Sequence, residues 1–228
     1  MEAFQESKCM TSFVDLSHIL EPDMPAYPGV PIPQFRTWFT HAESESRGAY
    51  APGTTFQIAT YEIGGNTGTY IDAPFHRFAG GKDLSELPLE SIADVPGICI
   101  STGPNRAIDA EVFAGKDLAG KAVLVHTGWS RHWLTESYFE DPPFLTQKAA
   151  DLLVKGKVAL VGIDSMNIDD IHDKARPVHT VLLKANIPIV EHLTNLGAVP
   201  GEGFRFFAVP VKVRAFGSFP VRAFAVIS

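Results

Sequence analysis

The chain has few of the features that would indicate a membrane, a disulfide scaffold or a nucleic-acid partner. Its 228 residues include two cysteines, Cys9 and Cys99, whose positions match neither a disulfide framework nor a zinc-finger spacing. No apolar run is long enough to cross a bilayer, and the opening MEAFQESKCM lacks the apolar core of a secretory signal. With 19 basic and 26 acidic residues the net charge is −7, which disfavours a phosphate backbone as a partner. We therefore expect a cytoplasmic protein with free thiols that binds neither nucleic acid nor a membrane.

The composition is that of a folded globular chain. Hydrophobic residues make up 45% of the sequence and charged residues 20%. No repeat, low-complexity tract or polar linker divides the chain. We expect an N-terminal tail over residues 1–11 and a single domain over residues 12–228.

Apolar runs alternate with helical patterns in the second half of the chain. The runs AVLVHTG and VALVGID are typical of buried strands covered on both faces. Between them, residues 143–156 carry apolar side chains at helical spacing and end at Gly156. A second helix is predicted over residues 175–186, where Pro177 suits the first turn, and the strand IPIVEHL follows it. This order predicts a mixed α/β fold, which the C-terminal runs FRFFAVPVKV and FPVRAFAVIS complete as further strands.

The first half of the chain contains fewer regular patterns. SFVDLSHIL predicts a short strand, and the five prolines of EPDMPAYPGVPIP predict a rigid extended surface segment. Residues 54–64 alternate apolar and polar positions like a half-buried strand, with Phe56, Ile58 and either Ala59 or Tyr61 facing inward.

A dense group of special residues, GNTGTYIDAPFH, follows that strand over residues 65–76. Its glycines allow a tight turn and a close approach of the backbone to a ligand. Pro74 stiffens the chain between Asp72 and His76, so a carboxylate and an imidazole are held near each other. The pattern indicates a functional site or, at about equal odds on composition alone, a glycine-rich turn with a capping aspartate and a surface histidine.

Two further candidates lie in the second half of the chain. His179 falls in the second predicted helix and Glu191 at the end of the strand that follows. A charged Glu191 after the apolar IPIV is costly to bury unless it is paired or bound to a cation. Both are candidate metal ligands, and the competing interpretation makes them an ordinary helical histidine and a strand-end carboxylate.

Several landmarks occur together along nearly the whole chain. They are VDLSHILEPDMPAYPG, GTYIDAPFH, VLVHTGW, GIDSMNID, HTVLLKANIPIVEHLTNL and PVRAFAV. Their order and spacing resemble the cyclase-like metal-dependent hydrolases, a family that includes bacterial kynurenine formamidase and isatin hydrolase. The resemblance implies a swivelling β/β/α-type domain with a mixed sheet, and a homodimer or higher homo-oligomer.

The resemblance also implies roles for individual residues. The family hallmark is HxGTHxDxPxH, in which the first two histidines and the aspartate bind metal and the last histidine transfers a proton. Here the segment reads NTGTYIDAPFH, so Asp72 and His76 match, whereas Asn66 and Tyr70 replace the two metal-binding histidines. His179 and Glu191 match the family's second pair of ligands. Asn66 offers a neutral oxygen and Tyr70 a phenol, which are weak ligands for a borderline-soft ion.

Together with these residues, the resemblance implies a metal-dependent hydrolase of a small cyclic or aromatic amide or lactone. One divalent ion, zinc, manganese or magnesium, would be held by Asp72, His179 and Glu191. His76 would move the proton and Tyr70 would donate to the developing oxyanion. The substrate pocket would include, besides Asn66, the residues His18, Tyr27 and Trp38. Two alternatives remain open: a metal-free cyclase, dehydratase or isomerase, and a ligand-binding pseudoenzyme of the same fold.

Overall fold

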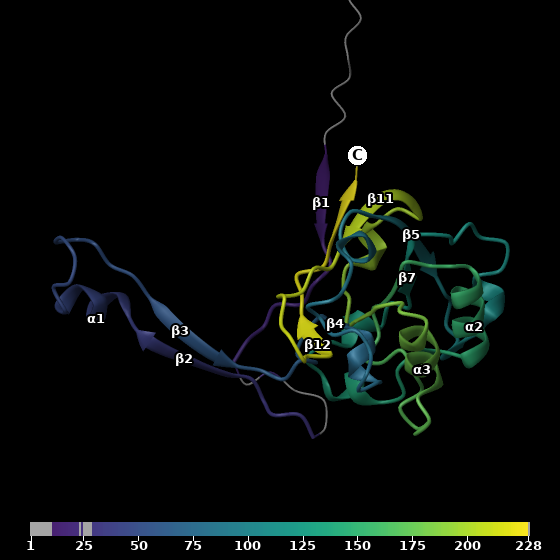
Figure 1. The fold of residues 1–228 in the computed structure, drawn as a ribbon, viewed down its shortest axis with the longest axis horizontal. Helices are drawn as coiled ribbons and strands as arrows, with labels where there is room; N and C mark the ends of the chain where they lie inside the picture. The colour runs from purple at the N-terminus through teal and green to yellow at the C-terminus, as the bar shows by residue number, and fades with distance from the viewer. Residues whose placement is uncertain (1–10, 23, 25–28, 228) are drawn as a thin grey trace, which may run out of the picture.

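A computed structural model describes residues 11–22, 24 and 29–227 (Figure 1). Its centre is a nine-stranded sheet in which β5, β7, β9 and β10 run parallel and the remaining strands pair antiparallel. This mixed sheet confirms the predicted α/β class. In spatial order the strands are β1 (Ser12–Asp15), β13 (Phe224–Ile227), β11 (Glu202–Phe207), β5 (Val95–Ser101), β7 (Ala122–His126), β9 (Leu160–Ile163), β10 (Ile189–Glu191), β4 (Tyr70–Asp72) and β12 (Ser218–Pro220).

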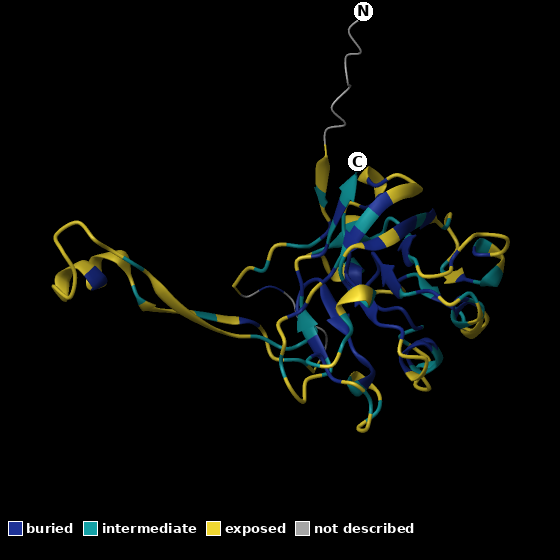
Figure 2. Ribbon diagram, turned by 45° about the horizontal axis from the view of Figure 1, so that its top comes forward, coloured by how far each residue is buried: buried dark blue, intermediate teal, exposed yellow. Residues whose placement is uncertain are grey.

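The central strands are buried on both faces, as their continuous apolar runs predict. Along β7, Val123 and Val125 pack into one hydrophobic cluster, whereas Ala122 and Leu124 pack into another. Alternate residues of a strand point to opposite faces, so the two clusters are the two sides of the sheet. Figure 2 shows the buried strands enclosed by more exposed loops and helices.

Two helices cover one face of the sheet, and both were predicted. They are α2 (Gln147–Lys155) and α3 (Pro177–Lys184), which pack against each other. The Thr146 side chain accepts a hydrogen bond from the Ala149 amide at the start of α2, and Gly156 caps its end. Proline occupies the first turn of α3, where its missing N–H would have had no partner.

The largest departure from expectation is an arm that projects from the body of the molecule (Figure 1). It consists of an antiparallel pair of strands, β2 (Gln34–Phe39) and β3 (Ile58–Glu62), with the short helix α1 (His41–Ser46) near its tip. The strand predicted over residues 54–64 therefore exists, but its predicted burial is wrong. Every residue of β3 is exposed, because β2 is its only strand neighbour among the described residues and no further layer of the described chain covers it.

The remaining elements are short. A parallel pair, β6 (Ala107–Ile108) and β8 (Phe144–Leu145), lies outside the main sheet. Cys99 is a free thiol, whereas Cys9 and most of the predicted tail lie outside the described residues. Within the described ranges, none of the helices has the length and apolar character needed to cross a membrane.

Candidate functional site

Strand register brings the first site residues together. In the pairing of β4 with its neighbours, Tyr70 lies opposite Glu191 of β10 and Asp72 lies opposite Ser218 of β12. Directly opposed residues point to the same face of a sheet, and so do residues two apart on one strand. The side chains of Tyr70, Asp72, Glu191 and Ser218 therefore lie on one face, and all four residues are buried.

A tight turn after β4 places His76 beside Asp72. The short 3-10 helix η1 (Pro74–His76) begins with the proline predicted to stiffen this segment. Gly217 lies so close to this turn that a Cβ atom there would come within 2.5 Å of the His76 backbone. Only glycine allows the chain before β12 to pass at that distance.

A hydrogen-bonded chain runs from Asp72 to His76 through Ser218. The Ser218 hydroxyl donates to Asp72 Oδ1 and lies 2.8 Å from His76 Nδ1. An ionised carboxylate can only accept, so the hydroxyl proton belongs to the bond with Asp72 and the hydroxyl oxygen accepts from Nδ1–H. That tautomer leaves His76 Nε2 without a proton, so this nitrogen can accept one.

His179 is oriented by a carboxylate at the start of α3. The Asp169 carboxylate accepts from the backbone amides of Val178 at 2.7 Å and His179 at 3.0 Å, and it lies 2.6 Å from His179 Nδ1. The same carboxylate therefore caps α3 and fixes the orientation of the His179 imidazole. With Nδ1 held by Asp169, the other ring nitrogen faces the remaining carboxylates.

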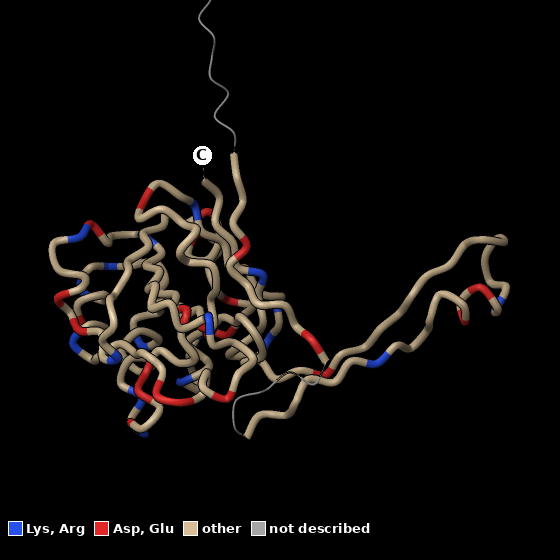
Figure 3. The backbone as a smooth tube through the Cα atoms, turned by 180° about the vertical axis from the view of Figure 1, so that it is seen from behind, with Lys and Arg blue, Asp and Glu red and all other residues tan. Residues whose placement is uncertain are grey.

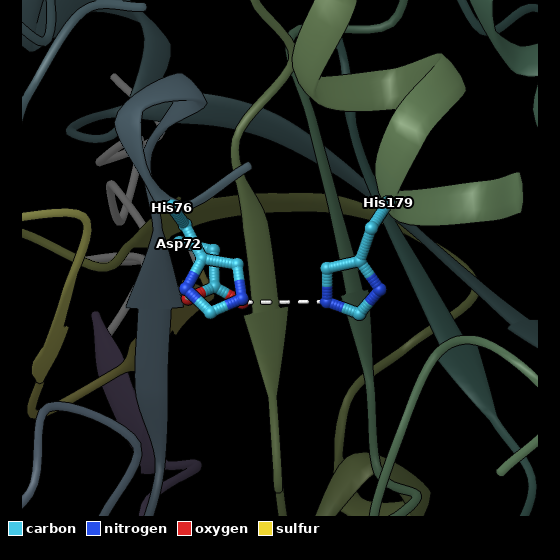
Figure 4. Close-up of side chains that lie close together, drawn as sticks. All are labelled: Asp72, His76 and His179. Atoms are coloured by element: carbon cyan, nitrogen blue, oxygen red, sulfur yellow. Dashed lines mark ion pairs between the residues drawn. The ribbon is translucent and has the colours of Figure 1, made fainter. Parts of the chain in front are cut away.

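His179 Nε2 faces two buried carboxylates of the site. His179 Nε2 lies 3.5 Å from Asp72 Oδ2 and 3.7 Å from Glu191 Oε1. Asp72 Oδ2 is buried and has no hydrogen-bond partner among the described residues. Ligands about 2.1 Å from one ion lie roughly 3.4 Å apart in a tetrahedral arrangement, so the spacing of Asp72 Oδ2 and His179 Nε2 fits two ligands of one divalent cation. His76 is close as well, since one ligand atom each of Asp72, His76 and His179 lies within 4.8 Å of the others (Figure 4).

Glu191 is held by two donors. Its Oε1 accepts from the Ile168 amide at 2.6 Å, and its Oε2 accepts from the Tyr70 hydroxyl. Burial, together with the charges of Glu191 and Asp72, raises the pKa of Tyr70 well above its usual value. The phenol therefore stays protonated and donates a hydrogen bond to Glu191. This corrects the expected oxyanion role of Tyr70, because its single donor is already engaged.

The charges of the site influence one another strongly. Burial raises the pKa of Glu191 to about 7. Burial alone would lower the pKa of His179, but the surrounding carboxylates of Glu191, Asp169 and Asp72 raise it to about 10. Burial also works to raise the pKa of Asp72, yet His76 and His179 together lower it. In the metal-free protein, a positive charge on His179 therefore balances the buried acids.

A cavity of about 240 Å³ opens above these residues. Its described lining includes Asn66, Tyr70, His76 and His179, which joins the NTGTY segment to the carboxylate and histidine cluster. The sequence thus predicts four of the residues that surround this cavity.

Comparison with known proteins shows the family to which this chain belongs. The Cyclase family model matches residues 14–170. The chain belongs to the Cyclase family. It is 32% identical over 217 residues to the kynurenine formamidase of Geobacillus thermodenitrificans, a match that covers 94% of this chain and 97% of the relative.

Solved structures show the same fold. Isatin hydrolase A from Labrenzia aggregata superposes with a TM-score of 0.82 at 23% identity, covering 95% of this chain and 94% of that chain. A structure described as a potential metal-dependent hydrolase with cyclase activity superposes with a TM-score of 0.78 at 25% identity, covering 96% and 99%. The family model and the formamidase relative confirm the family expected from the order of the sequence landmarks, and the solved structures confirm the fold.

Two proposed pocket residues of this Cyclase family member lie elsewhere. His18 is not among the described residues that line the cavity, and its ring stacks on Trp133 with centroids 4.0 Å apart. Trp38 belongs to β2 of the arm and is 65% exposed, so within one chain it does not line the cavity either. Both are corrections to the expected pocket. Tyr27 lies outside the described residues.

Sequence reasoning also missed residues that hold the site. Asp169 and Ser218 orient His179 and His76, and His192 lines the cavity. Burial lowers the pKa of His192 to about 3, so its ring is neutral. Asp169 could have been suspected from GIDSMNID, a polar segment directly after a buried strand, whereas nothing near Ser218 in the sequence marks it as a partner of Asp72.

Proposed function

We propose that this Cyclase family member hydrolyses an amide bond of a small molecule and uses one divalent cation. The observation that carries the proposal is the buried Asp72 Oδ2, which has no described hydrogen-bond partner and faces His179 Nε2. Asp72, His179 and Glu191 would hold the cation. The kynurenine formamidase and isatin hydrolase relatives support amide chemistry.

A cation at this position would polarise the carbonyl of the substrate and lower the pKa of water. Residues of the chain transfer the proton and position the proposed ligands. His76 Nε2 accepts a proton from the attacking water and returns it to the leaving nitrogen, since Ser218 fixes the opposite tautomer. Tyr70 positions Glu191 by hydrogen bonding to it, and Asp169 positions His179 in the same way.

The substitution of Asn66 and Tyr70 for two histidines favours one cation per chain. A protonated phenol that donates to Glu191 cannot supply an anionic oxygen to a second ion. The amide of Asn66 offers only a neutral oxygen. The donor set therefore supports a single site that manganese, zinc or magnesium can occupy.

The test is elemental analysis and hydrolysis of aryl formamides by the same preparations. We expect about one metal per chain in the wild type and a large loss of both metal and activity in His179→Ala. The control is His172→Ala, because His172 is an exposed histidine bonded to Asp141 on the surface. Hydrolysis that survives complete removal of metal would overturn the proposal and favour metal-free chemistry on Asp72 and His76.

We also propose that the protein works as a homo-oligomer built through the arm. Its exposed side chains include Trp38 at 65%, Tyr50 at 60% and Tyr61 at 68%. Figure 3 shows that much of the arm carries no Lys, Arg, Asp or Glu. An isolated two-stranded ribbon is marginally stable in water, and large exposed apolar groups mark an interaction surface.

A second copy of the chain is the expected partner, and light scattering on the purified protein should give at least twice the 24.8 kDa chain mass. A monomer at micromolar concentration would contradict this.

A further inference from the structure

A cluster of aromatic rings adjoins Tyr70, the residue whose hydroxyl holds Glu191. Its rings are those of His18, Trp133, Tyr138 and His192. They come from three segments that are distant in the sequence: the segment after β1, the loop after β7 and the chain after β10. Because aromatic rings pack in preferred geometries, such a cluster can hold a neighbouring side chain in a fixed position.

The His18 ring is stacked on Trp133. Their planes are 10° apart and their centroids 4.0 Å apart, whereas the other ring pairs of the cluster are tilted or edge-on. Burial lowers the pKa of His18 to about 4, so this ring is neutral. Its buried Nε2 has no hydrogen-bond partner among the described residues. The ring therefore contributes to the cluster through its flat face and not through a bond of that nitrogen.

Trp133 packs edge-on against His192. Their centroids lie 5.6 Å apart, with the planes at 82°. Tyr138 is fully buried and contacts both rings edge-on, at 5.1 Å from Trp133 and 5.6 Å from His192. With these two rings against it, the His192 ring stays in contact with Tyr70, whose centroid lies 5.2 Å away.

The same segments are also joined through their backbones. The His18 amide donates to Thr69 Oγ1 at 3.0 Å, and the Thr69 hydroxyl donates to the His192 carbonyl at 2.6 Å. The Thr194 amide donates to the Leu16 carbonyl at 3.0 Å. The segment after β1 is therefore fixed to the chain that directly follows β10, which gives the stacked imidazole a rigid support.

Building on the proposed metal site, we infer that His18 and Trp133 are positioning residues for Glu191. Through His192 they keep the Tyr70 ring in the place from which its hydroxyl donates to Glu191 Oε2. Neither His18 nor Trp133 belongs to the described lining of the cavity, so their effect on metal binding passes through the other rings.

The first test is metal affinity, measured by chelator competition with manganese or zinc. Loss of a residue that directly orients a metal ligand lowers affinity by roughly 10- to 100-fold. His18 and Trp133 act through intermediate rings, so we expect a smaller, graded loss. It should be roughly tenfold for Trp133→Leu, roughly threefold for His18→Ala and less than about twofold for His18→Phe, which keeps a flat ring on Trp133.

The matched control removes a stacked ring that lies away from the site. Phe207 of β11 stacks on Phe224 with centroids 4.7 Å apart and planes 3° apart, and three strands separate β11 from β10. Phe207→Ala should lower Tm but leave metal affinity within about twofold of wild type. A Trp133→Leu variant with the metal affinity of this control, or a His18→Phe variant that loses as much affinity as His18→Ala, would overturn the inference.

A measurement on the metal-free protein separates this inference from the proposed function. We would compare Tm in chelator for Tyr70→Phe, Trp133→Leu and the double variant. If Trp133 acts by holding the Tyr70 ring, the decrease in the double variant should fall short of the sum of the single decreases by more than about a fifth. Additive decreases would overturn the inference even in a protein that binds metal. Wild type that binds no metal would contradict the proposed function alone, and the Tm comparison would still decide the inference. If Trp133→Leu fails to fold, His18→Ala takes its place in both measurements.

Discussion

Two buried tyrosines of this protein should respond in opposite ways to the loss of their hydroxyl groups. The Tyr70 hydroxyl donates to Glu191 Oε2, whereas the Tyr138 hydroxyl is buried without a hydrogen-bond partner among the described residues. Tyr70 is 4% exposed and Tyr138 is fully buried, so replacement by phenylalanine removes one oxygen from a packed environment in both cases. Comparing the two variants therefore separates the contribution of the Tyr70 hydrogen bond from that of side-chain packing.

The expected magnitudes follow from the partners. A hydrogen bond to a charged group contributes about 1.5–3 kcal/mol, so Tyr70→Phe should lower the free energy of unfolding by that amount. For a chain of this size each kcal/mol shifts Tm by about 2–4 °C, which gives a decrease of about 3–12 °C. Removing the unpartnered hydroxyl in Tyr138→Phe should leave Tm unchanged or raise it, because a buried polar group without a partner costs about 1–3 kcal/mol.

In the metal-free protein, the loss of unfolding free energy caused by Tyr70→Phe should also grow as pH rises. Burial raises the folded-state pKa of Glu191 to about 7 from an ordinary value of 4.5. A raised folded-state pKa contributes stability that is present below pH 4.5 and is lost as pH rises through 7. The Tyr70 hydrogen bond opposes that rise in pKa, so its removal enlarges the loss at alkaline pH.

The assay is urea and thermal unfolding of wild type and both variants in chelator, at pH 6 and pH 8.5. We expect the free energy of unfolding of Tyr70→Phe to be lower than that of wild type at both pH values. The difference should be larger at pH 8.5. Equal destabilisation by the two substitutions, or a Tyr70→Phe deficit that shrinks as pH rises, would refute the assigned hydrogen bond between Tyr70 and Glu191.

Three further changes test other parts of the site and the fold. Asp169→Asn should weaken metal affinity by about 10- to 100-fold in a chelator competition, because the His179 ring loses its carboxylate partner; unchanged affinity would refute that role. In a Cys9→Ser background, Cys99 should react with a disulfide reagent at pH 8 roughly 100-fold more slowly than an ordinary thiol, since burial raises its pKa to about 11. Gly217→Ala should destabilise the fold by about 1–3 kcal/mol through contact with the His76 backbone, whereas Gly80→Ala, which has open space, should not.

The regular elements of the body could be predicted because their residue patterns match their environment. The strands around Leu124 and Val161 are apolar throughout, since both faces of the sheet are covered. The helices α2 and α3 show helical spacing together with a capping threonine or an initial proline. The exposure of the residues in the arm could not be predicted in this way. Alternation along residues 54–64 indicates a strand, but it does not show what packs against Ile58 or Tyr61.

The site was predictable only in part, for a related reason. Residue types and spacing single out Asp72, His76, His179 and Glu191. Their partners depend on strand register, which opposes Tyr70 to Glu191 and Asp72 to Ser218 across long sequence separations. A one-residue change in the register of β4 would move Tyr70 and Asp72 to the opposite face of the sheet. Pairing at this level is decided by the whole sheet, so the segment NTGTYIDAPFH alone does not reveal it.

Strand register also gives Tyr70 a structural role that its residue type alone does not reveal. At position 70 the side chain points at Glu191, and its neutral phenol donates a hydrogen bond to Glu191 Oε2. Glu191 Oε1 lies 3.7 Å from His179 Nε2, and that nitrogen lies 3.5 Å from Asp72 Oδ2. Tyr70 thus holds in place a carboxylate that we propose as a metal ligand. A Tyr70→His variant should therefore gain capacity for a second ion, and saturation with manganese or zinc followed by elemental analysis would show whether the metal content per chain rises above one.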